Sequence, residues 1–280
     1  MGLGIALAVF ATLWFALLDV TSQYVGKLVP MVMAVWFRFL FQTVTTTALL
    51  WPQYRSRLWQ TKSLRWQILR GLLMIGSGTV AFMSLRVVPV GEFTAILTLV
   101  PLCVTLMATL LLRERVPPLG WLLLIGGLTG ALVVMRPDSH GFGAATLLPL
   151  LLVLINSAYQ IVTSRMVRTE DPGVMHFYTG LVCLACSTLA VVPAWTVVTD
   201  WHVWVLMALM GVFGSLGHYV MIHAYHHAPA SRLQPYTYSQ VAFATLAGWV
   251  VFGHSPDAVS VAGIALIALC GLGSIRLKAG

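Results

Sequence analysis

Residues 16–33 read ALLDVTSQYVGKLVPMVM, and residues 158–175, which lie 142 positions further along, read AYQIVTSRMVRTEDPGVM. Eight of the eighteen positions are identical, including a Val-Thr-Ser run and a Pro-x-Val-Met ending. A second offset, of 140 positions, pairs other residues of the two halves: Gly71, Val80, Pro89, Thr105 and Leu106 with Gly211, Val220, Pro229, Thr245 and Leu246. We therefore expect one structural unit to occur twice, in residues 1–139 and 140–280. Repeats of this kind in a membrane protein indicate a secondary transporter, with its site where the repeats meet.

The composition is that of an integral membrane protein. Hydrophobic residues make up 59% of the chain, charged residues only 9%, and the mean hydropathy is +0.90. Soluble domains carry about 25% charged residues. Ten apolar runs each have roughly the 20 residues that a helix needs to cross a bilayer. They cover residues 3–24, 30–51, 68–88, 91–112, 118–136, 144–165, 172–194, 202–225, 232–252 and 258–276. An all-α fold of ten transmembrane helices is predicted.

The positions of the basic residues predict the orientation. Five spans in each repeat would place the two repeats in opposite orientations and both termini on one side. With the termini in the cytoplasm, twelve basic residues fall on the inner side: Arg55, Arg57, Lys62, Arg65, Arg70, Arg113, Arg115, Arg165, Arg168, Arg232, Arg276 and Lys278. The outer side then carries Lys27, Arg86 and Arg136. This bias predicts cytoplasmic termini in a cell inner membrane. It also accounts for the net charge of +8 without a nucleic-acid partner.

Other motifs limit the possible functions. The chain has no GxxxxGK[ST] phosphate loop, so it is not expected to hydrolyse ATP. All four cysteines lie within apolar runs, where the Cys183-x-x-Cys186 spacing is expected to reflect packing. We expect no cofactor and no bound metal. The expected partners are a small-molecule substrate and the lipid bilayer. Small-residue rows, Gly126 with Gly130 and Ala262 with Ala265, favour helix packing within a monomer, or alternatively a weak homodimer.

Polar side chains in the middle of apolar spans indicate where a substrate could bind. Such groups are costly in lipid and normally face a cavity or another helix. Most of them fall on the first, third, fourth, sixth, eighth and ninth spans, which are expected to surround the cavity. The second, fifth, seventh and tenth spans are more uniformly apolar and are expected to face lipid. The predicted cavity residues are Trp14, Ser77, Thr98, Asn156, Tyr159, Gln160, His218, Tyr238, Ser239 and Gln240.

Glycines and prolines within the spans predict hinges or kinks. A proline inside a helix leaves a backbone carbonyl without its usual partner. The predicted hinge or kink positions are Gly78, Pro101, Pro149, Gly217 and Pro235. The alternative is that they are fixed kinks and close-packing points without a moving role.

Three constellations have competing interpretations. Asp19 and Arg38 lie deep in adjacent spans and are predicted to form a structural ion pair, with substrate binding by Arg38 as the alternative. A row of histidines, His223, His226 and His227, has the spacing of a metal chelate but lies at a span end, where such side chains commonly reach the membrane surface. Ser215 and His218 resemble a serine–histidine dyad, although one helix rarely gives that pair the necessary geometry.

Two stretches at matching offsets resemble the EamA family of the drug/metabolite transporter superfamily. They are PLCVTLMATLLLRER at 101–115 and the segment from PYTYSQ at 235–240 through GWVVFG at 248–253 to Pro256 and Asp257. One departure is His254, where the family usually has a glutamate. The resemblance implies ten helices, residence in the inner membrane and export of small metabolites such as amino acids.

A non-ATP-driven exporter of amino acids or similar amphipathic compounds is therefore predicted. Export of nucleosides, vitamins or drug-like compounds is the alternative, and an intramembrane hydrolase is an alternative from another class. Asp19 is expected near an outer helix end, so the cavity is expected to lack a carboxylate and to suit a neutral or zwitterionic ligand. Proton-coupled carriers usually need a titratable group within the transport path, and His218 would be the only good candidate near the centre. Transport without a proton gradient is therefore expected.

Overall fold

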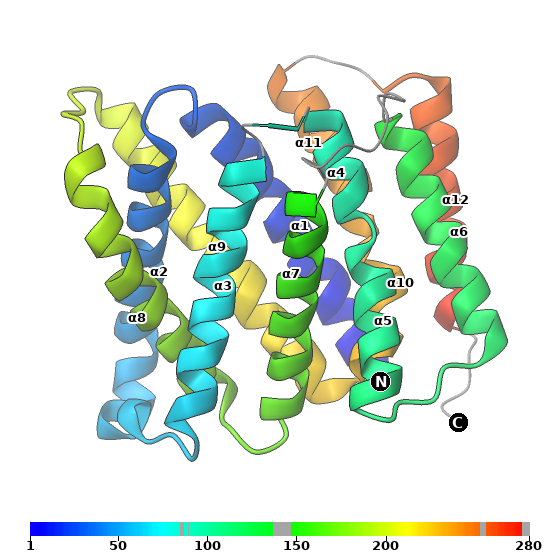
Figure 1. Ribbon diagram of the computed structural model, residues 1–280, viewed down its shortest axis with the longest axis horizontal. Helices are drawn as coiled ribbons and strands as arrows, with labels where there is room; N and C mark the ends of the chain where they lie inside the picture. The colour runs from blue at the N-terminus through cyan, green and yellow to red at the C-terminus, as the bar shows by residue number, and fades with distance from the viewer. Residues whose placement is uncertain (85–86, 89, 137–146, 253–255, 276–280) are drawn as a thin grey trace.

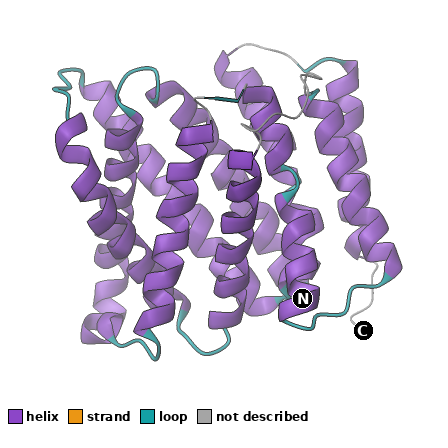
Figure 2. Ribbon diagram, viewed as in Figure 1, coloured by secondary structure: helices purple, strands orange, loops and turns teal. Residues whose placement is uncertain are grey.

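The computed structural model describes residues 1–84, 87–88, 90–136, 147–252 and 256–275. The predicted repeat boundary at residues 139 and 140, and His254, lie outside these residues. Within them the regular structure is helical (Figure 2). The α-helices are α1 (Gly2–Val25), α2 (Met31–Tyr54), α3 (Leu64–Ser84), α4 (Val90–Leu97), α5 (Val100–Leu111), α6 (Pro118–Met135), α7 (Leu147–Met166), α8 (Pro172–Val191), α9 (Trp201–His227), α10 (Ala230–Thr237), α11 (Ser239–Phe252) and α12 (Ala258–Ile275). Two 3₁₀ segments, η1 (Arg55–Trp59) and η3 (Val192–Ala194), follow α2 and α8.

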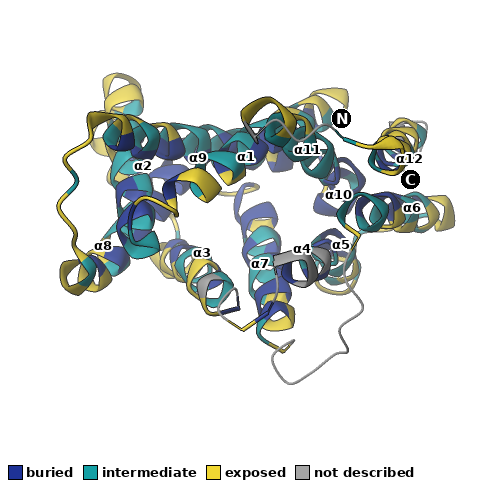
Figure 3. Ribbon diagram, turned by 90° about the horizontal axis from the view of Figure 1, so that it is seen from above, coloured by how far each residue is buried: buried dark blue, intermediate teal, exposed yellow. Residues whose placement is uncertain are grey.

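The helices form an integral membrane protein. Among the described residues, six helical segments are long and apolar enough to cross a bilayer; they contain α1, α2, α6, α7, α8 and α9. Large apolar side chains cover the outside of the bundle, as at Leu49, Leu189 and Val250, which are 74%, 83% and 82% exposed. Leucine and valine at such exposure suit contact with acyl chains. Viewed end-on, the buried positions face the interior of the bundle (Figure 3).

The packing of the helices relates the two halves of the chain. α1 packs against α9, and α7, which contains residues 158–166 of the repeated stretch, packs in the same way against α3. α2 packs against α9, and α8 packs against α3; α1 contacts α10 and α11, and α7 contacts α4 and α5. α2 also packs against α8, and α6 against α12. Figure 1 shows the N-terminus and the last turn of α12 at the same end of the bundle.

Two helices are interrupted at corresponding positions. α4 ends at Leu97 and α5 begins at Val100, while α10 ends at Thr237 and α11 begins at Ser239. The two ends, Leu97 and Thr237, are separated by the 140-residue repeat offset. The hydroxyl of Tyr238, in the second interruption, donates a 3.1 Å hydrogen bond to the carbonyl of Thr98, in the first. The two interruptions are therefore joined to one another.

The prolines predicted to cause kinks occupy different positions in their helices. Pro101 lies in the first turn of α5, directly after the interruption, and Pro235 lies inside α10, three residues before the second one. Pro149 is the third described residue of α7. The kink at Pro149 stays a prediction, because the residues directly before Leu147 lie outside the described part of the chain.

The glycines of α9 bring neighbouring helices close to it. A Cβ atom at Gly217 would lie 2.6 Å from Phe15, and one at Gly214 would lie 2.8 Å from Arg38 Nε. Gly217 lies within the uninterrupted helix α9, where it allows the Phe15 ring to approach closely. Gly78 in α3 has open space where a Cβ would be, because it faces the cavity described below. Gly126 and Gly130 face α12, which supports packing within one chain for that row.

Candidate functional site

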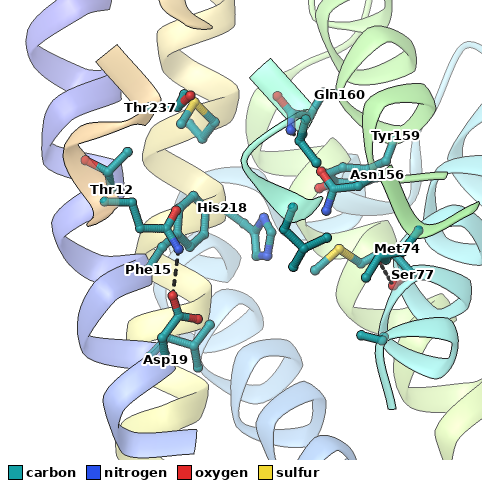
Figure 4. A pocket seen from close by; sticks show the side chains of 18 of the residues that line it. Thr12, Phe15, Asp19, Met74, Ser77, Asn156, Tyr159, Gln160, His218 and Thr237 are labelled. Carbon is teal, nitrogen blue, oxygen red and sulfur yellow. Dashed lines mark hydrogen bonds between the residues drawn. The ribbon is translucent and has the colours of Figure 1, made fainter. Parts of the chain in front are cut away.

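A cavity of about 520 Å³ lies in the middle of the bundle. This volume is typical of sites for small organic ligands. Its wall is formed by α1, α2, α3, α4, α5, α7, α9, α10 and α11, with Met135 from the end of α6. α8 and α12 contribute no lining residue, as expected for outer helices, whereas α2 contributes Val35, Arg38 and Phe39 and so departs from its predicted lipid-facing place. Figure 4 shows side chains from several helices pointing into the same space.

Most of the predicted cavity residues lie on this wall. They are Ser77, Thr98, Asn156, Tyr159, Gln160, His218, Tyr238 and Gln240. The two others, Trp14 and Ser239, do not line it. Trp14 packs against Phe10 and Phe213 with ring centroids 5.6 and 5.8 Å away. The cavity side of α1 carries Thr12, Phe15 and Asp19, at helical spacing, and Trp14 lies off that stripe.

Helical spacing also accounts for the wall residues that were not predicted. α9 presents His218, Met221, Ile222 and Tyr225, which follow the i, i+3, i+4, i+7 pattern of one helix face. Extending that face from His218 would have identified Tyr225. Phe15 and Thr12 on α1 could have been found in the same way.

An amide network occupies the α7 side of the cavity. Gln160 Nε2 donates to Asn156 Oδ1 at 2.9 Å. Gln160 Oε1 accepts from the Tyr225 hydroxyl at 2.7 Å and from Gln234 Nε2 at 3.2 Å. Tyr225 and Gln234 are buried, so both donors are held in place by packing.

Asp19 and Arg38 do not form the predicted ion pair. The Asp19 carboxylate accepts a 2.7 Å hydrogen bond from Gln240 Nε2 in α11. Arg38 Nη2 lies 3.2 Å from His218 Nε2 in α9. Both charged groups line the cavity. The physical reason is that each charged group has a neutral polar partner on a helix that is distant in the sequence. The prediction compared only the heights of the two residues in adjacent spans, and heights do not identify partners on other helices. The expectation of a cavity without a carboxylate was also wrong, because Asp19 lies in its wall.

The Arg38 contact determines the form of His218 that is compatible with it. A guanidinium group has donors only, so His218 Nε2 must be the acceptor. The proton of the neutral imidazole then lies on Nδ1. A cation and a neutral imidazole, rather than two cations, therefore share this part of the wall.

The other histidines do not form the arrangements considered from the sequence. Ser215 Oγ lies 2.9 Å from Nε2 of His176 in α8, not beside His218 in a dyad. Within the described part of the chain, no group of three histidine, cysteine or acidic side chains is arranged to hold a metal ion.

Comparison with known proteins identifies the type of protein to which this cavity belongs. The model of the EamA-like transporter family matches residues 2–136 and again residues 143–275. The chain belongs to the EamA-like transporter family. Members of this family are multi-pass membrane transporters rather than enzymes. A crystal structure with 20% identity superimposes over 97% of this chain and 96% of its own, with a TM-score of 0.85, and supports the same fold.

Relatives of this EamA-like protein carry several kinds of small metabolite. A riboflavin transporter of Brucella anthropi is 28% identical over 95% of this chain and 96% of its own length. An S-adenosylmethionine uptake transporter of Rickettsia bellii is 25% identical over 89% of this chain and 85% of its own. A pseudopaline exporter of Pseudomonas aeruginosa is 23% identical over 99% and 97%. The family makes this chain a membrane transporter, and the three relatives are named for different small metabolites.

Proposed function

We propose that this EamA-like protein is a secondary transporter of a planar heteroaromatic metabolite, with riboflavin as the first candidate. The observation that carries the proposal is the similarity to a riboflavin transporter over nearly the whole of both chains. The cavity supports it, because Phe15, Tyr159 and Tyr225 provide ring contacts while amides provide hydrogen bonds. Vitamins were the alternative to amino acids, and the named relatives favour that alternative.

The proposed architecture is two inverted repeats of five spans each, in residues 1–139 and 140–280. In this arrangement α4 with α5 forms one interrupted span, and α10 with α11 forms another. The cytoplasm would hold both termini, as the bias of the basic residues predicts. Interrupted helices beside a central cavity are a recurring feature of transporters built from inverted repeats.

The helix packing at the two ends of the cavity supports a proposal about the conformational state. α5 packs against α10 near the end of the bundle that holds the termini, whereas α4 and α11 are not packed together to a comparable extent within the described residues. The wall extends toward the opposite end, where it includes Ala81 and Met135. With cytoplasmic termini, we propose that this is a state closed to the cytoplasm and that alternating access would bring α4 against α11.

Glu114 ties the closed end together. Its carboxylate accepts hydrogen bonds from Ser231 N at 2.9 Å, Ser231 Oγ at 2.6 Å and Ala230 N at 3.3 Å, at the start of α10. Arg168, between α7 and α8, lies 3.8 Å from it. A carboxylate at a helix N-terminus is favourably placed for the helix dipole. These bonds stabilise α10 in the closed position.

Flux measurements in liposomes test the proposal. The purified full chain should move riboflavin down its gradient in both directions, without ATP, and excess unlabelled riboflavin should compete. Empty liposomes and a panel of amino acids are the controls. Transport of amino acids without binding of any heteroaromatic compound would overturn the proposed substrate class.

A further inference from the structure

Asn156 presents a hydrogen-bonding edge to the cavity that its neighbours do not use. Its Oδ1 accepts one hydrogen bond, from Gln160, and an amide oxygen has two lone pairs. Its two amide hydrogens have no acceptor among the described residues. Figure 4 shows the end of this side chain in the space shared with His218 and Met74. A donor and an acceptor therefore lie side by side at the ligand position.

The orientation of this edge is set from behind. Gln160 Oε1 accepts two hydrogen bonds, from Tyr225 and from Gln234, so both of its lone pairs are engaged. Turning the Gln160 amide over would place an N–H group against two donors. Gln160 Nε2 is thereby kept toward Asn156, which must present Oδ1 to it and direct Nδ2 elsewhere. The network therefore fixes the orientation of the Asn156 amide, with Oδ1 toward Gln160 and Nδ2 away from it.

We propose that Asn156 selects ligands whose ring edge carries an acceptor next to a donor. This inference rests on the proposed function and refines its substrate class. A carbonyl beside a ring N–H, as in the imide of a flavin, pairs with an amide in this way. A ring nitrogen beside an amino group, as in adenine, does so equally, and asparagine reads adenine by this geometry elsewhere. The selected class is thus a planar heterocycle with a lactam, imide or amidine edge.

The rest of the cavity agrees with this class of ligand. Tyr159 follows Asn156 by three residues on the same face of α7, and its ring centroid lies 6.1 Å from that of His218. Phe15 lies 4.9 Å from His218, measured in the same way. Aromatic faces next to an amide edge suit a flat ring that is stacked on its faces and read at its edge. Within the repeat, the position equivalent to Asn156 is Trp14, which lies off the cavity wall, so the edge exists on one side only.

The test compares ligand pairs that differ at this edge. Riboflavin is compared with 3-methylriboflavin, and adenosine with N6,N6-dimethyladenosine, by binding and flux with the full chain in liposomes. The wild type should prefer the unmethylated member by about tenfold or more, as expected when a site's polar groups are left unpaired. Asn156→Leu should weaken binding of the preferred compound by roughly 10–100-fold and reduce the preference to about twofold or less.

Two further variants separate selection from folding. Ser157→Ala, the next residue of α7, removes a buried hydroxyl that has no partner among the described residues, and should leave the preference unchanged. Tyr225→Phe removes one of the two bonds that orient Gln160. It should reduce the preference by roughly threefold to tenfold, because the Gln160 amide is then less firmly oriented. A merely structural role for Tyr225 would change the amount of folded protein and not the ratio between two ligands.

Each outcome has a distinct meaning. Riboflavin flux with the same preference in the wild type and Asn156→Leu would overturn the role of Asn156 and leave the proposed function in place. An Asn156-dependent preference within the adenosine pair alone would support the edge and remove riboflavin as substrate. Binding of neither pair by the wild type would overturn both.

Discussion

Arg38 and Asp19 show how a charged residue is accommodated in an apolar bundle without an ion pair. Arg38 lies in a groove left by Gly214 and donates to His218, while Asp19 accepts from Gln240. Each charge is partnered by a neutral group on a helix far away in the sequence. Both charges also line the cavity, so water or a ligand can reach them.

This arrangement predicts that the two charges are coupled only weakly, because each has its direct hydrogen-bond partner on another helix. Asp19→Asn keeps an oxygen for Gln240 and should lower the free energy of unfolding by less than about 1 kcal/mol. A double-mutant cycle with Arg38→Gln, followed by thermal unfolding, should give a coupling energy below about 0.5 kcal/mol. A buried ion pair would instead lose roughly 3–5 kcal/mol in either single variant, with partial recovery in the double variant.

The sequence predicts single cavity residues better than it predicts their partners. Polar residues at mid-span positions of α7 and α9 were found because an isolated amide or imidazole in a lipid-length helix has few other places to point. Trp14 was wrongly predicted to line the cavity, because the prediction used its depth in the membrane and not the face of α1 on which it lies. Asp19 and Gln240, which are joined by a hydrogen bond, lie 221 residues apart in the sequence, and no local pattern encodes such a contact.

At the scale of elements, the matched interruptions of α4–α5 and α10–α11 define the centre of the molecule. Proline explains where the first interruption ends, since α5 begins one residue before Pro101. The second interruption lies three residues after Pro235, so its position does not follow from the proline alone. What fixes it is the partner: Tyr238 reaches across to the Thr98 carbonyl.

Tyr238→Phe should therefore loosen the contact between the two interrupted spans. The ring stays packed against Leu124 and Ile267, while the hydrogen bond is lost, at a cost of about 1 kcal/mol. The melting temperature of the detergent-solubilised protein should fall by a few degrees. Tyr236→Phe is the matched control, because its hydroxyl has no hydrogen-bond partner among the described residues. Equal shifts in the two variants would argue against a specific role for the bond.

Glu114 allows a test of the closed end. Glu114→Gln removes the charge that the N-terminus of α10 favours and replaces one acceptor oxygen by a donor. If the closed state loses about 1.4 kcal/mol, the population open to the cytoplasm rises tenfold. A cysteine introduced at Thr237, on the cavity wall, should then react faster with an impermeant reagent supplied from the cytoplasmic side.

Arg168→Gln serves as the control in the same assay. The Arg168 side chain is 61% exposed and lies 3.8 Å from Glu114, so its contribution to the closed end should be small. Unchanged reactivity in Glu114→Gln would show that other contacts hold α5 and α10 together.

At the scale of the whole molecule, the fold class was predictable and the state was not. Apolar runs of lipid-spanning length predicted a helical membrane protein, since few other folds satisfy backbone groups in lipid. The shared stretches of the two halves predicted their similarity, and the family model matches the two halves separately. Which end is closed depends on whether α5 meets α10 or α4 meets α11, and no local sequence pattern decides between these two packings.

Topology is tested by labelling from the two sides of the membrane. The segment around η1 and the segment between α8 and α9 lie at opposite ends of the bundle (Figure 1). Cysteines at the exposed positions Ser56 and Thr199 should react with an impermeant reagent from the cytoplasmic and the outer side, respectively. The parent chain, whose four native cysteines are buried or partly buried, provides the background. Labelling of both positions from one side would contradict the inverted repeat.

The packing of α1 against α9 has a consequence for how the chain is synthesised. Gly4 lies against Ala224 and Ala228, near the end of α9, and Ala8 belongs to the same buried cluster. α9 begins only at Trp201. At about 5–20 residues per second, α1 waits on the order of 10–40 s for this partner after it leaves the ribosome. During that interval its row of small side chains must tolerate acyl chains or the insertion machinery. A nascent chain that stalls before residue 201 therefore carries an uncovered first helix, and would be the form that membrane proteases remove first.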